Sequence, residues 1–217
     1  MTEHTLLKKD LFGEIRISTD DGEVLIVRDS NGASRWVRWL ARLLMRREAR
    51  ALVALANLDG VPQLRIIAQN LLVRSYIPGK PMHRSKPSDP AYFNAAARLL
   101  RRLHGAGVVH NDLAKEPNIL VRDDGSPAFV DFQLAWFATR RSYLFRLLAR
   151  EDLRHLLKHK RTYCPRALTI RERSILSNPS LLSRLWMQLA KPVYLFITRV
   201  LLGWADREGA ADRGDQT

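Results

Sequence analysis

The fold of this chain is decided by residues 108–132, VVHNDLAKEPNILVRDDGSPAFVDF. Asp112 and Asn118 belong to a polar loop, and Asp131 directly follows a short apolar strand predicted over residues 128–130. Two acids and an asparagine at the ends of short strands are the side chains that phosphoryl transfer from a nucleotide requires. One acid orients a hydroxyl or accepts its proton, while the other acid and the asparagine bind Mg²⁺. The alternative is an ordinary turn, because Asn and Asp both favour turns.

The wider sequence LHGAGVVHNDL, followed by an Asn and by VDF, resembles the catalytic core of the protein-kinase-like superfamily. The resemblance is nearest to the small bacterial lipopolysaccharide sugar kinases (Kdo and heptose kinases) and to the RIO-type atypical kinases. It implies an α+β, protein-kinase-like two-lobed fold with a truncated helical C-lobe. The predicted divisions are one kinase-like domain over residues 1–207, an N-lobe over 5–76, a hinge over 77–81, a C-lobe over 82–207 and a disordered tail over 208–217.

The resemblance also assigns roles within the loop. Asp112 would be the base that orients the hydroxyl, and Lys115 would neutralise charge on the moving γ-phosphate. Asn118 and Asp131 would bind Mg²⁺, so ATP and Mg²⁺ are the implied cofactors. The family motif places Asn five residues after Asp, whereas the step from Asp112 to Asn118 is six residues. Lys115 keeps the family's interval to Asn118, so the extra residue falls between Asp112 and Lys115.

Two neighbouring positions set further expectations. His110 is expected to support the loop structurally. Gln133 replaces the Gly that usually follows Asp-Phe, which removes backbone freedom and predicts a fixed segment rather than a switchable activation loop. No A-P-E sequence follows, so the peptide platform of conventional protein kinases is predicted to be missing.

Three residues of the predicted N-lobe are assigned to the nucleotide side of the site. The sequence FGEIRI resembles the second half of a kinase glycine-rich loop, in which Gly13 would let phosphates approach the backbone. The sequence EVLIVR resembles the strand that carries the phosphate-binding lysine, and Arg28 takes that position. Glu48, the sole acid in a helix predicted over residues 33–57, is assigned as the partner of Arg28. The alternatives are a solvated arginine at a strand end and an exposed glutamate.

Hydrophobic periodicity predicts the remaining elements. Residues 64–68 and 71–76 alternate as the strands of a hairpin. Asp89 followed by Pro90 predicts the start of a helix over 91–104. Residues 143–160 predict another helix, which Cys164-Pro165 ends. A last helix over 181–204 is rich in Trp and apolar residues and punctuated by Arg, which suits either a bilayer interface or the core of the C-lobe.

Composition limits the class of protein. A hydrophobic content of 46% with 27% charged residues predicts a globular chain rather than a disordered one. Cys164 is the single cysteine, which excludes an internal disulfide, fits a reducing cytoplasm and predicts a packing or surface thiol rather than a nucleophile. The chain shows no apolar run of signal-peptide or transmembrane length, so a cytoplasmic location is expected. A net charge of +14 calls for an anionic partner, which could be a nucleotide, a nucleic acid, a phosphorylated glycolipid or an anionic membrane.

The expected activity is transfer of the ATP γ-phosphate to a hydroxyl. A lipopolysaccharide-core sugar is the first acceptor expected, because the peptide platform is missing and the basic, Trp-rich helices suit the inner face of a membrane. A RIO-like serine/threonine protein kinase is the competing enzyme. A nucleotide-binding pseudokinase or membrane adaptor is the alternative from another class, because Arg28 and the lengthened loop depart from the family. Nucleic-acid binding is disfavoured, since no RNA-recognition motif is present.

Overall fold

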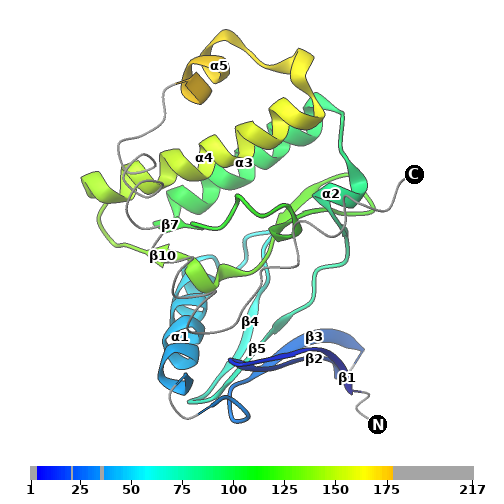
Figure 1. Cartoon of the computed structure of the whole chain (residues 1–217), viewed down its shortest axis with the longest axis vertical. Coiled ribbons are helices and arrows are strands. Elements are labelled where there is room, and N and C mark those ends of the chain that lie inside the picture. Colours follow the sequence, from blue (N-terminus) through cyan, green and yellow to red (C-terminus); the bar gives the residue numbers. More distant parts are fainter. Residues whose placement is uncertain (1–3, 21, 35–36, 178–217) are drawn as a thin grey trace, which may run out of the picture. The chain divides into compact units, whose positions relative to one another are not determined.

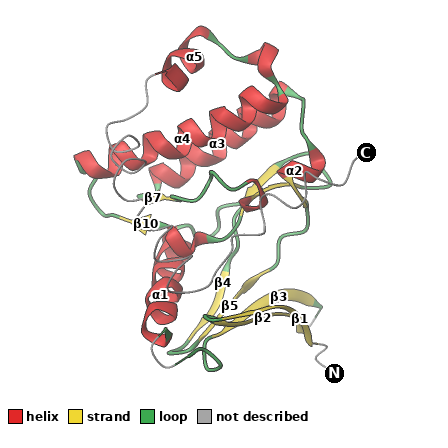
Figure 2. Cartoon of the chain, viewed as in Figure 1, coloured by secondary structure: helices red, strands yellow, loops and turns green. Residues whose placement is uncertain are grey.

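The computed structural model describes residues 4–20, 22–34 and 37–177, and residues 1–176 form one compact unit. An antiparallel sheet comes first in the chain and most of the helical residues follow it, which is the separation of strands and helices typical of the α+β class (Figures 1 and 2). The predicted α+β, kinase-like class is therefore confirmed. The predicted helix over 181–204 and the tail over 208–217 lie outside the described residues.

The N-terminal sheet has five antiparallel strands in the spatial order β1-β2-β3-β5-β4. They are β1 (His4–Asp10), β2 (Gly13–Asp20), β3 (Glu23–Asp29), β4 (Leu64–Ile67) and β5 (Leu71–Ser75). Strands β3, β4 and β5 lie where strands were predicted, and β2 contains most of the FGEIRI segment. β1 was not predicted as a strand, because its LLKKD sequence lacks alternation; it forms the edge of the sheet, where Leu6 and Leu7 stay exposed.

Helix α1 (Arg38–Ala54) is shorter than the helix predicted over 33–57. At its start the chain must first turn after β3, and the amide of Ala33 donates to the carbonyl of Ser30 within that turn. At its end Asn57 adopts a left-handed conformation with φ of 64°, which ends helical geometry. Arg42 of α1 donates to Asn70 Oδ1 at 2.8 Å, so the helix also secures the loop that carries Asn70.

The C-terminal part of the unit is built on two long helices that pack together. They are α3 (Pro90–Gly105) and α4 (Tyr143–Tyr163), and the shorter elements are β6 (Lys80–Pro81), α2 (Met82–Ser85), β7 (Val108–Val109), η1 (Glu116–Asn118), β8 (Ile119–Val121), β9 (Pro127–Phe129), η2 (Phe132–Leu134), β10 (Trp136–Phe137), η3 (Pro165–Ala167) and α5 (Ile170–Ser177). Asp89 caps α3 as predicted, accepting from the amide of Ala91 at 2.8 Å.

The largest core cluster joins α3, the end of α1 and the strands around the polar loop. Phe93, Leu100, Leu103 and Phe129 are among its fully buried members, and Cys164 packs in the same cluster, as expected of a packing thiol. No helix within the described residues combines the length and apolarity needed to cross a membrane. Val108, Ile119 and Phe129 belong to this core cluster, so the strands next to the polar loop, β7, β8 and β9, are each held by the core.

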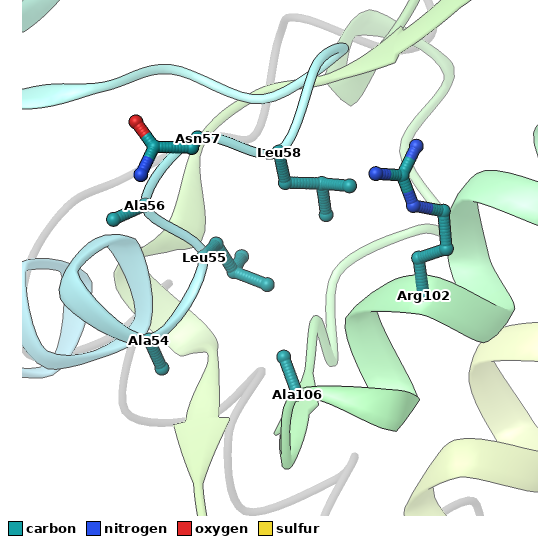
Figure 3. Close-up of a pocket in the computed structure, with 7 residues that line it drawn as sticks. All are labelled: Ala54, Leu55, Ala56, Asn57, Leu58, Arg102 and Ala106. Carbon is teal, nitrogen blue, oxygen red and sulfur yellow. The ribbon is translucent and has the colours of Figure 1, made fainter.

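A pocket of about 320 Å³ lies where the end of α1 meets the end of α3. Figure 3 shows Leu55 and Leu58 pointing toward Arg102 and Ala106 across it. Its lining contains no acid and none of the residues assigned to phosphoryl transfer. The pocket is therefore separate from the candidate site.

Gly13 is required by the sheet itself. Its φ is 122°, and a Cβ built on it would overlap the carbonyl oxygen of Asp29 in β3. Gly13→Ala is expected to reduce the free energy of unfolding by about 2–3 kcal/mol, measured by urea denaturation. Gly32→Ala is the matched control, because nothing lies within 4 Å of its added Cβ, and a change within about 0.5 kcal/mol is expected there. Unchanged stability of Gly13→Ala with weakened nucleotide binding would instead support a phosphate-binding role alone.

Candidate active site

The polar loop is brought together by a short hairpin. β8 and β9 pair antiparallel with Ile119 opposite Phe129, and the amide of Val130 donates to the carbonyl of Asn118 at 3.0 Å. This register places Asn118 and Asp131 at the same end of the hairpin. Asp112 lies in the loop between β7 and η1, in contact with Asn118.

Asn118 joins the loop to the hairpin. Its side-chain nitrogen donates to Asp112 Oδ2 at 2.8 Å and to the Asp112 carbonyl at 3.0 Å. Lys115 Nζ lies 3.3 Å from the same carboxylate oxygen. The lengthened step is closed by two successive turns, in which the Lys115 amide donates to the Asp112 carbonyl and the Asn118 amide donates to the Lys115 carbonyl. The six-residue spacing therefore still brings Asp112 and Asn118 into contact.

The Asp112 carboxyl has a pKa above its ordinary value. Burial is the largest cause, and the charge of nearby Asp131 adds to it, while Lys115 and Asn118 act in the opposite direction. A base whose pKa is raised toward neutral pH is better matched to accept a proton than an ordinary aspartate. The environment thus favours the proton-accepting role assigned to Asp112.

Asp131 occupies an unusual backbone conformation just beyond β9. Its φ of 63° and ψ of 73° are left-handed, which few residues other than glycine adopt. Its Oδ1 is buried and accepts no hydrogen bond from any described residue. Strained backbone and an unpaired buried oxygen are costly, and both are found where a side chain has a ligand to bind.

Helix α4 contacts the loop through Asp152, an acid that was not predicted to have a role. Asp152 is buried and accepts from the backbone amides of His110 at 2.7 Å and Asn111 at 2.9 Å. His104 Nε2 approaches the same carboxylate at 3.2 Å. His110 is itself buried, with Nε2 3.0 Å from the Val130 carbonyl. This geometry fits the structural role expected of His110.

Two further residues of α4 contact the same loop about two and three helical turns after Asp152. His159 Nε2 lies 2.8 Å from the carbonyl of Leu113, and the Tyr163 hydroxyl donates to Glu116 Oε2 at 2.6 Å. Asp152, His159 and Tyr163 are seven and then four residues apart, so they share one face of the helix. One face of α4 therefore fixes the loop along residues 110–116.

The segment after Asp131 is tied on two sides. Arg47 of α1 donates to the carbonyls of Leu134 and Ala135, each at 3.2 Å. Asn111 Nδ2 donates to the Leu134 carbonyl at 3.0 Å from the loop side. These contacts fit the fixed segment predicted from Gln133.

Glu48 lies buried between α1 and the sheet, in contact with two arginines. Its Oε2 is 3.8 Å from Arg28 NH1, and its Oε1 is 3.0 Å from Arg74 Nε. Met45 and Ala49, on either side of Glu48 in α1, pack against Leu72 of β5 and hold the helix on the sheet. The predicted pairing of Glu48 with Arg28 occurs, but Arg74 is the closer partner.

Comparison with known proteins identifies the family. Residues 26–173 match the RIO domain. The chain belongs to the RIO domain family. A protein of Methanoculleus marisnigri, named a probable bifunctional tRNA threonylcarbamoyladenosine biosynthesis protein, is 33% identical to it over 119 residues. The match covers 52% of this chain and 22% of that relative, so this chain spans about a fifth of the relative's length.

Membership of the RIO family decides between the two resemblances. The RIO-like alternative is supported, whereas neither the family match nor the name of the relative points to a lipopolysaccharide sugar. The preference for a sugar also depended on the Trp-rich helix over 181–204, which lies outside the described residues. The RIO reading is therefore the better supported of the two.

The RIO domain places the predicted residues in two groups. Asp112, Lys115 and Asn118 contact one another, and the register of β8 and β9 places Asp131 at the same end of the hairpin as Asn118. Arg28 and Glu48 lie together between α1 and the sheet. Gly13 instead packs against the backbone of Asp29 within the sheet. Asp152 and Arg74 were missed. An acid within a basic helix and an arginine on a short strand carry no local signal, although strand alternation places Arg74 on the same face as buried Leu72.

Proposed function

We propose that this RIO domain is an ATP-dependent phosphotransferase that uses Mg²⁺ and transfers the γ-phosphate of ATP to a hydroxyl. The observation that carries the proposal is the contact of Asp112 with Asn118 beside the unpaired, buried Oδ1 of Asp131. It supplies a base of raised pKa next to oxygen ligands for a cation. Membership of the RIO family supports the same chemistry.

The oxygen atoms around Asp131 fit Mg²⁺. Asn118 uses its side-chain nitrogen on Asp112, so its side-chain oxygen is the atom left for a cation. That oxygen and the Asp131 carboxylate are the hard ligands that Mg²⁺ prefers. Within the described residues no three His, Cys, Asp or Glu side chains form a metal-binding cluster. Mg²⁺ commonly binds one or two protein oxygens together with nucleotide phosphates and water, and it supplies electrostatic stabilisation of phosphate charge.

The residues of the chain would divide the reaction as follows. Asp112 accepts a hydrogen bond from the acceptor hydroxyl and takes its proton as the new oxygen–phosphorus bond forms. The bond between the γ-phosphorus and the β–γ bridging oxygen breaks, and ADP leaves with that oxygen. Lys115, 3.3 Å from Asp112 and largely exposed, offsets the charge of the phosphoryl group in transit. Arg28 contacts a phosphate of the bound nucleotide.

We assign a protein serine or threonine hydroxyl as the acceptor, because the family match favours the RIO-like enzyme over the sugar kinase. We also propose that the protein acts in the cytoplasm. The glycolipid sugar and the anionic membrane surface stay predictions from the sequence. The glycolipid sugar is tested together with the protein acceptor in one assay.

The test is transfer of labelled γ-phosphate from Mg-ATP to a soluble protein extract and to a membrane glycolipid extract in parallel. Label on protein that disappears with Asp112→Asn is expected. Label on glycolipid alone would restore the sugar acceptor. The protein and its variants are also unfolded by heat with and without Mg-ATP. At a hundredfold excess over Kd, a ligand stabilises the protein that binds it by about 2.7 kcal/mol. Asp131→Ala is expected to lose this stabilisation.

One result would contradict the proposed activity, and another would contradict the assignment of Asp131. Stabilisation by Mg-ATP without any label sensitive to Asp112→Asn would indicate a nucleotide-binding pseudokinase. Equal stabilisation of Asp131→Ala and the unmodified protein would remove Asp131 as a metal ligand. Asp123→Ala is the matched control for both aspartates, because Asp123 is exposed on the turn between β8 and β9. It is expected to leave transfer and stabilisation unchanged.

A further inference from the structure

One buried acid faces two buried arginines between α1 and the sheet. The side chain of Glu48 has no exposed surface, and those of Arg28 and Arg74 are 13% and 11% exposed. Within the described residues Glu48 is the ion-pair partner that both arginines share. Neither carboxylate oxygen accepts a hydrogen bond of good geometry from any described residue, so the contacts are electrostatic and leave both guanidinium groups with donors to use.

The sheet register explains why the two arginines meet. β3 and β5 are antiparallel, with Arg28 opposite Leu72 and Ile26 opposite Arg74. Residues directly opposite one another point to the same face, and so do residues two apart along a strand. Both arginines therefore project from one face of the sheet, which is the face that α1 covers.

The charges of this cluster do not balance. The cluster holds two guanidinium groups and one carboxylate, which neutralises only one of them. A positive charge largely removed from water is unfavourable unless an anion accompanies it. The cluster is thus short of one anion, and a nucleotide phosphate is the anion that a phosphotransferase must bind.

We propose that Arg74 is a positioning residue that holds Glu48 and thereby leaves Arg28 available to bind a phosphate of the nucleotide. Arg74 is the nearer of the two to the acid, at 3.0 Å against 3.8 Å for Arg28. In the family pattern a single lysine both pairs with the helix acid and contacts the phosphates. Here the two tasks are divided between two arginines. This inference rests on the proposed function.

The test measures the dissociation constants of Mg-ATP and of adenosine, which lacks phosphate, by titration calorimetry. Arg28→Met is expected to weaken ATP binding roughly tenfold or more, because a charge-assisted phosphate contact is lost, and to leave adenosine binding unchanged. Arg74→Met is expected to do the same through Arg28, which Glu48 then draws to itself. The double variant Arg74→Met/Glu48→Gln is expected to recover ATP affinity to within roughly threefold, since no acid remains to capture Arg28.

Control variants separate positioning from folding. Arg74→Lys keeps the positive charge and is expected to bind ATP within roughly threefold of the unmodified protein. Arg65→Met removes an exposed arginine from the same sheet and is expected to change neither affinity. Thermal unfolding of every variant establishes that it is folded. If Arg74→Met alone does not fold, the double variant and Arg74→Lys still test the proposal, because the first removes the charge of Glu48 together with Arg74 and the second keeps a cation beside Glu48.

The measurements distinguish failure of the role proposed for Arg74 from failure of the proposed function. ATP binding by the unmodified protein with unchanged ATP affinity in Arg74→Met would overturn the division of tasks and leave the proposed function standing. Failure of the double variant to recover ATP affinity would also overturn it, because a purely structural role for Arg74 predicts no recovery. Absence of ATP binding by the unmodified protein would overturn the proposed function and this inference together.

Discussion

Asp112→Asn is expected to reduce phosphoryl transfer by roughly two to four orders of magnitude, which is the usual contribution of a general base. The amide keeps the size of the side chain and an oxygen for Asn118 to donate to, but it does not accept a proton at neutral pH. Binding of Mg-ATP is expected to persist, because Asp131 and Arg28 are untouched. Single-turnover transfer and calorimetric titration measure the two properties separately, and unchanged transfer would remove Asp112 from the reaction.

Because the pKa of Asp112 is raised, Asp112→Asn is expected to increase the stability of the fold while it reduces phosphoryl transfer. In the folded state Asp112 holds its proton at a pH where the unfolded chain, with an ordinary value of 3.8, has released it. The free energy of unfolding therefore falls as pH rises from 3.8 through the raised pKa, and ionised Asp112 destabilises the fold at pH 7. Asp112→Asn is thus expected to unfold at a higher temperature at pH 7, with the difference disappearing below pH 3.8.

The same pKa sets the acidic limb of the activity profile. Transfer needs the carboxylate form of Asp112, so kcat/KM is expected to fall as pH drops through a value above 3.8. Lys115 lowers this pKa, and Lys115→Met is expected to move the limb to higher pH. A limb that moves to lower pH would contradict the assignment of Asp112 as the base.

Asp152→Ala is expected to cost about 3–5 kcal/mol of unfolding free energy, the largest loss among the single substitutions considered. It leaves two backbone amides of the loop, those of His110 and Asn111, buried without an acceptor, and each such group costs about 1–3 kcal/mol. His104 loses its acid at the same time. Urea denaturation at pH 7 measures the effect.

Two comparisons make the Asp152 result specific. Asp152→Asn keeps one carbonyl oxygen and is expected to lose less stability than Asp152→Ala, because one amide of the loop stays paired. Asp123→Ala is expected to change stability by less than about 0.5 kcal/mol, because Asp123 is exposed. A loss for Asp152→Ala no larger than that of Asp123→Ala would show that the loop does not depend on α4.

Local chemistry made much of the fold and of the site predictable. Asp89 before Pro90 marked the start of α3 because capping depends on adjacent residues. The loop from Asp112 to Asn118 and the acid at Asp131 were found because motif residues lie close together in sequence. The hairpin of β8 and β9 then guarantees that they are also close in space.

Other features depend on contacts that no short window of sequence contains. Arg74 joins Glu48 only through the pairing of β5 with β3, so its role could not be inferred from the short strand that carries it. The start of α1 was predicted too early because Ala33 and Ser34 are compatible with a helix, while the turn after β3 requires them elsewhere. β1 lacks alternation and acquires its strand geometry from β2.

The contacts of α4 with the loop also bear on the synthesis of the chain. Asp152, His159 and Tyr163 follow their partners in the loop by 42, 46 and 47 residues. At ribosomal rates of 5–20 residues per second, the last of these supports is added about 2–9 s after its partner in the loop. During that interval the nascent chain carries the residues assigned to phosphoryl transfer without the helix that fixes their loop. If the proposed function holds, transfer is expected only after α4 has emerged and docked.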